Sequence, residues 1–268
     1  MSLSIRDLQF AYQQTPVLDG IGFDAAAGEL LMILGANGAG KTTLFRCILG
    51  EQKRYKGRIE IDGVDARTLS ARETAHRIAY IPQTHAMTFR YSVRDMVLMG
   101  TSHGLSPVAS PHARELRIAD EAMRRIGILS LADRSFDRLS GGEQQLTYIA
   151  RALAQQTKIL LMDEPTASLD YGNQMRVLSV IGGLKNDGYT VLLSTHNPQH
   201  ALWFADRVLA MQNGRAIGFG TPKDTLTEPL FRTLYGTDVA LVETERGTVI
   251  LPPKPEITGI SEEKEIPS

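Results

Sequence analysis

Two glycine-rich stretches of the chain could each bind an anion, because each opens a predicted helix. The first, GANGAGKTT at residues 35–43, fits the pattern G-x-x-x-x-G-K-[ST] and lies between a predicted strand and a predicted helix. The second, LSGGEQQ at residues 139–145, has no lysine. Backbone N–H groups at a helix N-terminus favour phosphate in both cases. Only the first stretch adds a side-chain cation, which raises the question of what the second one binds.

The first stretch has the residue types that hold a nucleoside triphosphate. Gly35, Gly38 and Gly40 let the backbone curl so that its N–H groups point at phosphate. Lys41 would place its charge on the β- and γ-phosphates, and Thr42 would offer its hydroxyl to Mg²⁺. A chance glycine loop is the alternative, but the flanking strand and helix favour nucleotide binding.

Two acidic residues end a later apolar strand, in ILLMDEP at residues 159–165. Neighbouring residues of a strand point to opposite sides, so Asp163 and Glu164 can do different work. Asp163 is placed to hold Mg²⁺, and Glu164 to act as general base on a water molecule. The alternative is an acidic pair that faces solvent, and the lysine loop upstream favours the nucleotide site.

Three further polar residues follow predicted strands or lie close to one. Gln83 could bind Mg²⁺ or orient water, although a lone glutamine is often just a polar loop residue. His196 ends the stretch TVLLSTH and should lie at the carboxyl edge of the sheet, where ligands collect. His200 makes an H-x-x-x-H spacing with it, but Asn197 and Pro198 make a poor zinc site, so we expect an ordinary surface histidine.

The pattern of apolar residues predicts a mainly parallel α/β fold for the elements that must position these residues. Short apolar or alternating runs predict strands at residues 28–35, 57–63, 77–83, 158–165, 189–196 and 207–214. Runs that are continuously apolar suit strands covered on both faces. From residue 92 to about 157 the pattern turns helical.

We therefore expect four regions. Residues 1–85 and 158–236 form the nucleotide-binding α/β core with an N-terminal β subdomain, and residues 86–157 form an inserted helical subdomain. Residues 237–251 form a small hairpin that turns at Arg246-Gly247, and the proline-rich, charged residues 252–268 form a disordered tail.

Composition limits the partners that the chain could have. A net charge of −1 gives no overall attraction to nucleic acid, and the single cysteine excludes an internal disulfide. No run of 18 apolar residues is present, so any work at a membrane would go through a partner.

Taken together, the motifs resemble those of an ABC transporter ATPase in type and in order. They are GANGAGKTT, Gln83, LSGGEQQ, ILLMDEP, the ASLD of residues 167–170 and the STH that ends at His196. The resemblance extends to about residue 236 and implies a P-loop NTPase (RecA-like) core, with an antiparallel β subdomain and an inserted helical subdomain. Ala36 stands where proline is frequent and Gln144 where arginine is frequent, but neither change removes a catalytic group.

The resemblance also implies roles for single residues. It assigns contacts with ATP to the whole loop, namely Gly35, Asn37, Gly38, Ala39, Gly40, Lys41, Thr42 and Thr43. Asp163 matches the Walker B aspartate, Glu164 the catalytic glutamate and His196 the switch histidine. Gln83 matches the Q-loop and Asp170 the D-loop. Tyr12 matches the aromatic residue on which adenine stacks, with a strand aromatic that fills the core as the alternative.

In this family two such domains pair head to tail, which would explain why the chain has two anion-binding stretches. Ser140, Gly141 and Gly142 of one chain would then close over the γ-phosphate of an ATP held by the lysine loop of the other. The second stretch needs no lysine because the partner supplies it. The resemblance, and not the spacing, implies this homodimer.

The stretch YIPQTHAMTFRYSVRDMVLMGTSHG at residues 80–104 is similar to the ATPases of importers for ferric siderophores, haem, vitamin B12 and related metal chelates. This implies an ATPase that is peripheral on the cytoplasmic face of the inner membrane. It would pair with permease subunits and, indirectly, with a substrate-binding protein. Apolar residues between Gln83 and Met99 would contact the permease or fill the subdomain core; they are Met87, Phe89, Tyr91, Val93 and Met96. The alternatives are an ABC ATPase that acts on ribosomes or DNA, an importer ATPase for another substrate class, and a regulatory module with little turnover.

Overall fold

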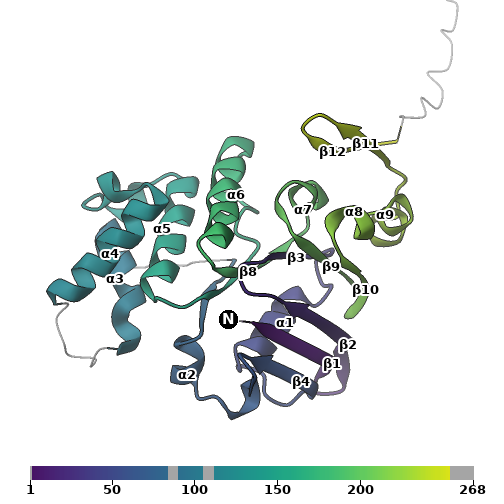
Figure 1. The fold of residues 1–268 in the computed structure, drawn as a ribbon, viewed down its shortest axis with the longest axis horizontal. Coiled ribbons are helices and arrows are strands. Elements are labelled where there is room, and N and C mark those ends of the chain that lie inside the picture. The colour runs from purple at the N-terminus through teal and green to yellow at the C-terminus, as the bar shows by residue number, and fades with distance from the viewer. Residues whose placement is uncertain (1, 84–89, 105–111, 254–268) are drawn as a thin grey trace, which may run out of the picture.

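A six-stranded, mainly parallel sheet forms the centre of the molecule (Figure 1). The computed structural model describes residues 2–83, 90–104 and 112–253. The strand order is β10-β9-β3-β8-β7-β6. The strands are β3 (Leu30–Leu34), β6 (Ile78–Ile81), β7 (Ile159–Asp163), β8 (Thr190–Thr195), β9 (Arg207–Gln212) and β10 (Arg215–Gly220). Only β10 runs antiparallel to its neighbour.

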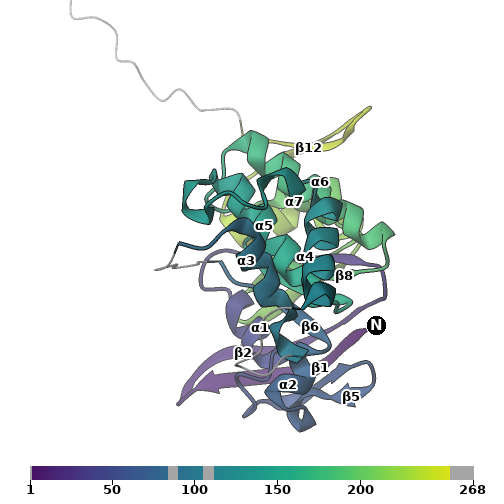
Figure 2. The ribbon, with the colours of Figure 1, turned by 90° about the vertical axis from the view of Figure 1, so that its left-hand side faces the viewer.

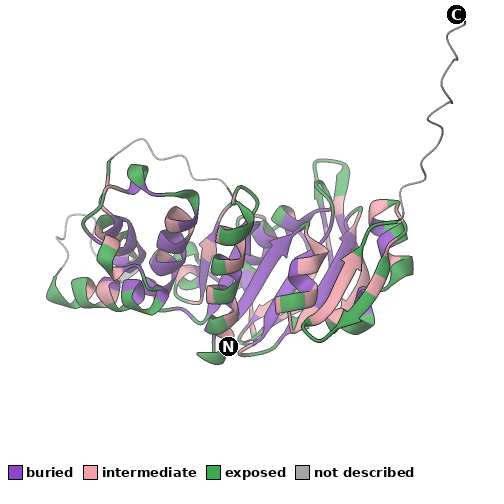
Figure 3. Ribbon diagram, turned by 90° about the horizontal axis from the view of Figure 1, so that it is seen from above, coloured by how far each residue is buried: buried purple, intermediate pink, exposed green. Residues whose placement is uncertain are grey.

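Every residue of β3, β7 and β8 is buried, as the continuously apolar runs predict (Figure 3). The predicted α/β class and its parallel core are therefore confirmed. Because parallel strands all end at one edge, the residues that follow β3, β6, β7 and β8 are brought together there. These residues include the glycine loop, Gln83, Glu164 and His196.

Alternate residues of β3 enter two separate hydrophobic cores, one on each face of the central sheet. Leu31 and Ile33 pack with α1 (Lys41–Ile48) and with a four-stranded antiparallel sheet of order β2-β1-β4-β5. That sheet contains β1 (Leu3–Tyr12), β2 (Thr15–Ala25), β4 (Lys56–Ile61) and β5 (Val64–Asp65). Helix α1 thus lies between two sheets, which fixes the end of the helix that carries Lys41 (Figure 1). The short helices η1 (Ala66–Thr68) and α2 (Ala71–Ala75) follow β5.

A group of helices lies at one end of the central sheet (Figures 1 and 2). It contains α3 (Val93–Leu98), η2 (Met99–Gly104), α4 (Ala113–Ile126), η3 (Leu129–Leu131), η4 (Phe136–Arg138) and α5 (Gly141–Ala154). Val93 and Met96 are fully buried in this group. Of the two alternatives, they therefore fill the subdomain core and do not form a permease-contact surface, because α4 and α5 cover their face of α3. Tyr91 is partly buried, and Met87 and Phe89 lie outside the described residues.

Helices α6 (Tyr171–Asn186) and α7 (Pro198–Phe204) pack on the same face as this group. The chain then continues through α8 (Pro222–Thr225), α9 (Glu228–Tyr235) and the hairpin of β11 (Ala240–Thr244) and β12 (Gly247–Leu251). Because Thr244 pairs with Gly247, the hairpin turns at Glu245-Arg246, one residue before the predicted position. The predicted tail lies outside the described residues from residue 254 onward. No helix in the described part of the chain is long and apolar enough to cross a membrane.

Candidate active site

The loop between β3 and α1 has the backbone geometry of an anion cradle. Gly38 and Gly40 have positive φ angles of 82° and 101°. This conformation is unfavourable for any residue with a side chain, but glycine adopts it readily. A Cβ atom on Gly35 would lie 2.5 Å from the Met211 carbonyl oxygen, so only glycine fits there. The loop leads into the N-terminus of α1, whose first N–H groups lack partners within the helix.

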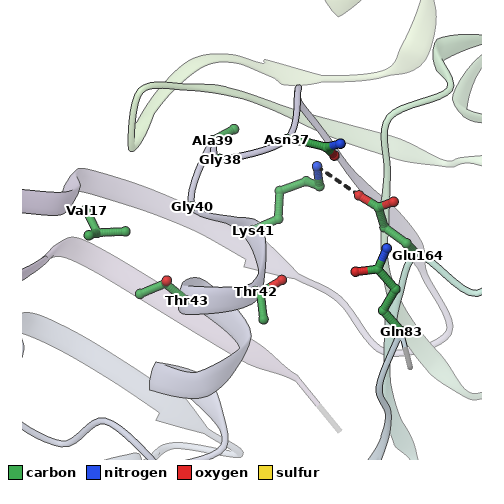
Figure 4. A pocket seen from close by; sticks show the side chains of 10 residues that line it. All are labelled: Val17, Asn37, Gly38, Ala39, Gly40, Lys41, Thr42, Thr43, Gln83 and Glu164. Carbon is green, nitrogen blue, oxygen red and sulfur yellow. Dashed lines mark ion pairs between the residues drawn. The ribbon is translucent and has the colours of Figure 1, made fainter. Parts of the chain in front are cut away.

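Lys41 lies buried at the start of α1, with 5% of its surface exposed. Its ammonium group donates to the carbonyl oxygens of Gly35 at 2.7 Å and Ala36 at 3.2 Å. It also forms an ion pair of 3.1 Å with Glu164, which is drawn as the dashed line in Figure 4. A buried charge must be paired. The Lys41 ammonium group is therefore held in the loop by these three contacts, which the oxygen atoms of a bound phosphate could replace.

Asp163 is the last residue of β7 and is held on both carboxylate oxygens. Thr42 donates its hydroxyl to Oδ2 at 2.7 Å, and Ser194 donates its hydroxyl to Oδ1. Ser194 lies directly opposite Asp163 in the parallel pairing of β7 with β8. Sequence reasoning missed Ser194. The only indication in the sequence that Ser194 belongs to the site was its position at the end of an apolar strand, two residues before His196.

Glu164 follows Asp163 and turns out of the strand with a φ angle of 46°. Non-glycine residues in this region cost about 1–3 kcal/mol and cluster at functional sites. The Glu164 N–H donates to the Ser194 hydroxyl at 2.9 Å, which fixes the turn. One carboxylate oxygen meets Lys41, and the other lies 3.0 Å from His196 Nδ1. The imidazole can therefore donate a hydrogen bond from Nδ1–H to this carboxylate.

These residues surround a cavity of about 400 Å³ (Figure 4). The lining consists of Val17, Asn37, Gly38, Ala39, Gly40, Lys41, Thr42, Thr43, Gln83 and Glu164. Asp163 and His196 join it through their contacts with Thr42 and Glu164. Sequence reasoning did not find Val17, which carries no chemical signal. The phosphate loop and the residues predicted for hydrolysis thus lie in one place.

Tyr12 does not line this cavity. It ends β1 and is 37% exposed, so it does not fill the core. Its ring meets Phe10 edge to face at 4.9 Å, and its hydroxyl accepts from the Arg46 guanidinium at 3.4 Å. Since Arg46 belongs to α1, the ring is held on the same helix that carries Lys41.

Residues 139–143, LSGGE, form the N-terminus of α5 and also lie outside the cavity lining. Ser140 is the N-cap, and its hydroxyl accepts from the Glu143 N–H at 3.3 Å. The Glu143 carboxylate accepts from the Ser140 N–H at 2.9 Å. This reciprocal pair is a capping box, and the S-x-x-E spacing was the signal in the sequence that could have predicted it. The Ser140 N–H bond is the main reason that the pKa of Glu143 lies below its usual range, so the carboxylate stays ionised.

Gly142 and Asp170 meet through Asn173 of α6. A Cβ atom on Gly142 would lie 2.3 Å from the Asn173 side-chain oxygen. Asp170 caps α6 and accepts from the Asn173 backbone N–H at 2.9 Å and from its side-chain amide at 2.7 Å. The backbone bond is the main cause that lowers the pKa of Asp170. The predicted site residues therefore form two groups, and Asn173, which sequence reasoning missed, organises the second.

His200 is not a surface histidine as predicted, because only 3% of it is exposed. It lies on α7 against the large core, with Nε2 3.0 Å from the Asn197 side-chain amide nitrogen. Burial, with a smaller effect of His196, lowers the pKa of His200 from 6.5 to about 4. The side chain is therefore neutral at physiological pH.

Comparison with known proteins gives one consistent result. A family model described as ABC transporter matches residues 18–167. The hemin import ATP-binding protein HmuV of Rhodococcus jostii (strain RHA1) is 37% identical over 88% of this chain and 81% of its own length. The molybdate import ATP-binding protein MolC of Haemophilus influenzae (strain ATCC 51907 / DSM 11121 / KW20 / Rd) is 35% identical over 87% and 88% of the two chains. A solved ATP-binding cassette of an ABC transporter in its ADP conformation is 27% identical, with a TM-score of 0.80 over 88% of this chain and 98% of that one.

Proposed function

This chain belongs to the ABC transporter family, and we propose that it binds and hydrolyses ATP in the cavity beside Lys41 to drive import through a separate permease. One observation carries the proposal. The Lys41 ammonium, the Asp163–Thr42 pair and the Glu164–His196 pair meet at a single cavity, at the carboxyl edge of the sheet. Each is a group that phosphoryl transfer to water requires.

Binding of the triphosphate follows from the loop and from Lys41. The N–H groups of the loop and of the first turn of α1 receive the phosphate oxygens. Lys41 then exchanges its contacts with Gly35, Ala36 and Glu164 for the β- and γ-phosphates. We propose that Tyr12 stacks on the adenine, because its ring is exposed and its hydroxyl contacts Arg46 of α1, the helix that begins at Lys41.

The cavity also fits a magnesium ion. Mg²⁺ prefers oxygen ligands and usually binds one or two carboxylates together with substrate phosphates. Thr42 Oγ1 and Asp163 Oδ2 are already 2.7 Å apart, and Gln83 lines the same cavity with a side-chain amide oxygen. These three residues would hold the ion, which supplies charge neutralisation on the phosphates.

Glu164 acts as the general base. Once Lys41 has turned to the phosphates, the carboxylate is free to accept a proton from a water molecule. The water oxygen attacks the γ-phosphorus, and the bond to the β-phosphate oxygen breaks, which gives ADP and phosphate. His196 Nδ1–H holds the other carboxylate oxygen and so orients the base.

The signature residues Ser140, Gly141 and Gly142 act on the ATP of a second copy of this chain. In support of this, they lie at the N-terminus of α5, an anion-binding position, and yet they do not line the cavity of their own chain. Their contact through Asn173 with Asp170 would join both motifs in one dimer interface. In this homodimer two ATP molecules are buried between the chains.

The importer substrate we propose is a metal chelate such as haem, a ferric siderophore or cobalamin. The support is the similarity to relatives named for hemin import and the stretch after β6 that resembles such ATPases. Membrane permease subunits are the direct partners, a substrate-binding protein is an indirect one, and nucleic acid is not a partner. The chain then works at the cytoplasmic face of the inner membrane as a peripheral protein. The partly exposed Met99, after α3, is a candidate contact with the permease.

The test is ATP turnover by the full chain and by Glu164→Gln. The amide cannot accept the proton but keeps the shape, so hydrolysis should fall by about 10²-fold or more while ATP binding persists. Gel filtration with ATP should then show a stable dimer. The matched control is Glu121→Gln, whose side chain is 70% exposed on α4 and should leave turnover unchanged. A Glu164→Gln protein that hydrolyses ATP at the parental rate would show that the base lies elsewhere.

Co-purification separates the importer from the other proposals. When the chain is expressed with its neighbouring genes and isolated from membranes, an integral membrane partner should accompany it. Met99→Glu should weaken this association and leave ATP turnover of the isolated chain unchanged. Recovery with ribosomes or DNA instead would favour an ABC ATPase that acts on those partners.

A further inference from the structure

The C-terminal part of the chain contacts the loop that carries His196. Tyr235, the last residue of α9, donates its hydroxyl to the His196 carbonyl oxygen at 3.2 Å. These two residues are 39 positions apart in the sequence. Neither the family motifs nor the cavity lining includes Tyr235. The contact therefore links the hydrolytic site to a segment that the proposed function leaves without a role.

A second contact holds the same loop a few residues later. The Gln199 side chain donates to the Thr248 carbonyl oxygen at 2.8 Å and accepts from the Ile250 N–H at 2.9 Å. The amide thus pairs with the free edge of β12 as a neighbouring strand would, and Figure 1 shows the hairpin beside α7. The start of α7, directly after His196, is therefore held by the hairpin.

Helix α9 is a firm support for Tyr235. Phe231 and Leu234 are buried in the large core, with 2% and 8% exposed. The Gln212 side chain at the end of β9 donates to the Thr233 carbonyl oxygen at 2.7 Å. Burial also raises the pKa of the Tyr235 hydroxyl to about 12, so it remains a donor throughout the neutral range.

His196 needs such support because packing does not hold its ring. Its side chain is 53% exposed, whereas the Glu164 side chain that it contacts is only 8% exposed. A ring in solvent can keep a 3.0 Å contact only if its backbone is fixed. On the strand side, the Asn197 N–H donates to the Thr195 hydroxyl at 3.0 Å. On the other side, Tyr235 holds the His196 carbonyl group itself.

We propose that Tyr235 is a positioning residue for ATP hydrolysis, whose hydroxyl fixes the His196 backbone so that the imidazole stays on the Glu164 carboxylate. This rests on the proposed function, in which Glu164 is the base. The C-terminal segment of α9 and the hairpin thereby becomes part of the catalytic apparatus, although it touches no substrate. Because Tyr235 acts after ATP is bound, it should affect kcat and not the KM for ATP.

The first test is Tyr235→Phe in the full chain, which removes the hydroxyl and keeps the ring. Loss of one positioning hydrogen bond should lower kcat by about three- to ten-fold, with the KM for ATP within about two-fold of the parental value. The control is Tyr55→Phe. Within the described residues the buried Tyr55 hydroxyl has no hydrogen-bond partner, so its removal should leave kcat unchanged. An unchanged kcat in Tyr235→Phe, or a change confined to KM, would overturn the proposal.

A double-mutant cycle with His196→Ala separates positioning from general stability. If Tyr235 acts through the imidazole, Tyr235→Phe should have no further effect on the residual kcat of His196→Ala. A purely structural role would lower kcat by the same factor in both backgrounds, and that result would also overturn the proposal. Failure of the proposed function is seen separately, as absent turnover in the parental chain or full turnover in Glu164→Gln.

Discussion

Ser194→Ala tests whether one buried hydroxyl organises both acidic residues of the site. Ser194 is fully buried and donates to Asp163 Oδ1 while it accepts from the Glu164 N–H. Without the hydroxyl, a buried carboxylate oxygen and a buried N–H lose these bonds. The space left by one oxygen atom is too small for a water molecule to replace it.

The expected cost follows from these two losses. Each unsatisfied buried group costs about 1–3 kcal/mol, but Asp163 keeps its bond from Thr42, so a total of about 2–4 kcal/mol is reasonable. For a chain of this size that corresponds to a fall in Tm of roughly 4–8 °C. Turnover should fall by about ten-fold or more, because the turn at Glu164 loses the bond that fixes it.

The assay combines thermal unfolding by circular dichroism with steady-state ATP hydrolysis. Ser179→Ala, at an exposed position of α6, removes the same group from a site without such contacts and should leave both measurements unchanged. If Ser194→Ala melts within about 1 °C of the parental protein and hydrolyses ATP normally, the two acidic residues do not depend on the Ser194 hydroxyl.

Three other outcomes are expected. Gly142→Ala should destabilise the chain by about 1–3 kcal/mol in denaturant unfolding, because the new Cβ atom would lie 2.3 Å from the Asn173 side-chain oxygen on α6. The control Gly183→Ala, on α6, places its Cβ atom in open space and should be neutral or stabilising. The pKa of His200 is lowered to about 4 in the folded chain, so as the pH falls the unfolded chain binds the proton first. The free energy of unfolding should therefore fall by about 3 kcal/mol between pH 6.5 and pH 4. In urea unfolding measured across this pH range, His200→Gln should show a smaller fall. Lys41→Ala and Ser140→Arg chains, each also carrying Glu164→Gln to block hydrolysis, should retain almost no ATP as homodimers but about one ATP per mixed dimer in a filter assay. Equal, negligible retention in mixed and unmixed samples, with heterodimers shown to form, would exclude a shared site.

The local patterns of the sequence were sufficient for the fold class and for the phosphate loop. Continuous apolar runs predicted β3, β7 and β8 because strands covered on both faces need apolar residues at every position. The G-x-x-x-x-G-K-T pattern predicted a strand, loop and helix because the glycines and the lysine act within a few residues of one another. The ILLMDEP stretch similarly placed Asp163 and Glu164 at a strand end.

Contacts between segments that are distant in the sequence could not be predicted from local patterns. Ser194 faces Asp163 only because of the register between β7 and β8, and no local pattern encodes that register. Asn173 meets Gly142 only because α5 packs on α6. Tyr235 reaches His196 only because α9 is anchored beside β9. Each of these contacts joins elements whose mutual placement depends on the packing of the whole domain.

Burial was the property that the sequence misjudged most. His200 was predicted to be an ordinary surface histidine because its spacing with His196 makes a poor zinc site, yet on α7 it is buried. The sequence left open whether Val93 and Met96 contact a partner or fill the core, and in the structure α4 and α5 cover them. A single helix shows which of its faces is apolar, but only the tertiary structure decides what covers that face, because the covering side chains come from other elements. The sequence by itself therefore determined the type of chemistry and the elements that carry it, whereas the tertiary structure decided which side chains hold the reacting groups in place.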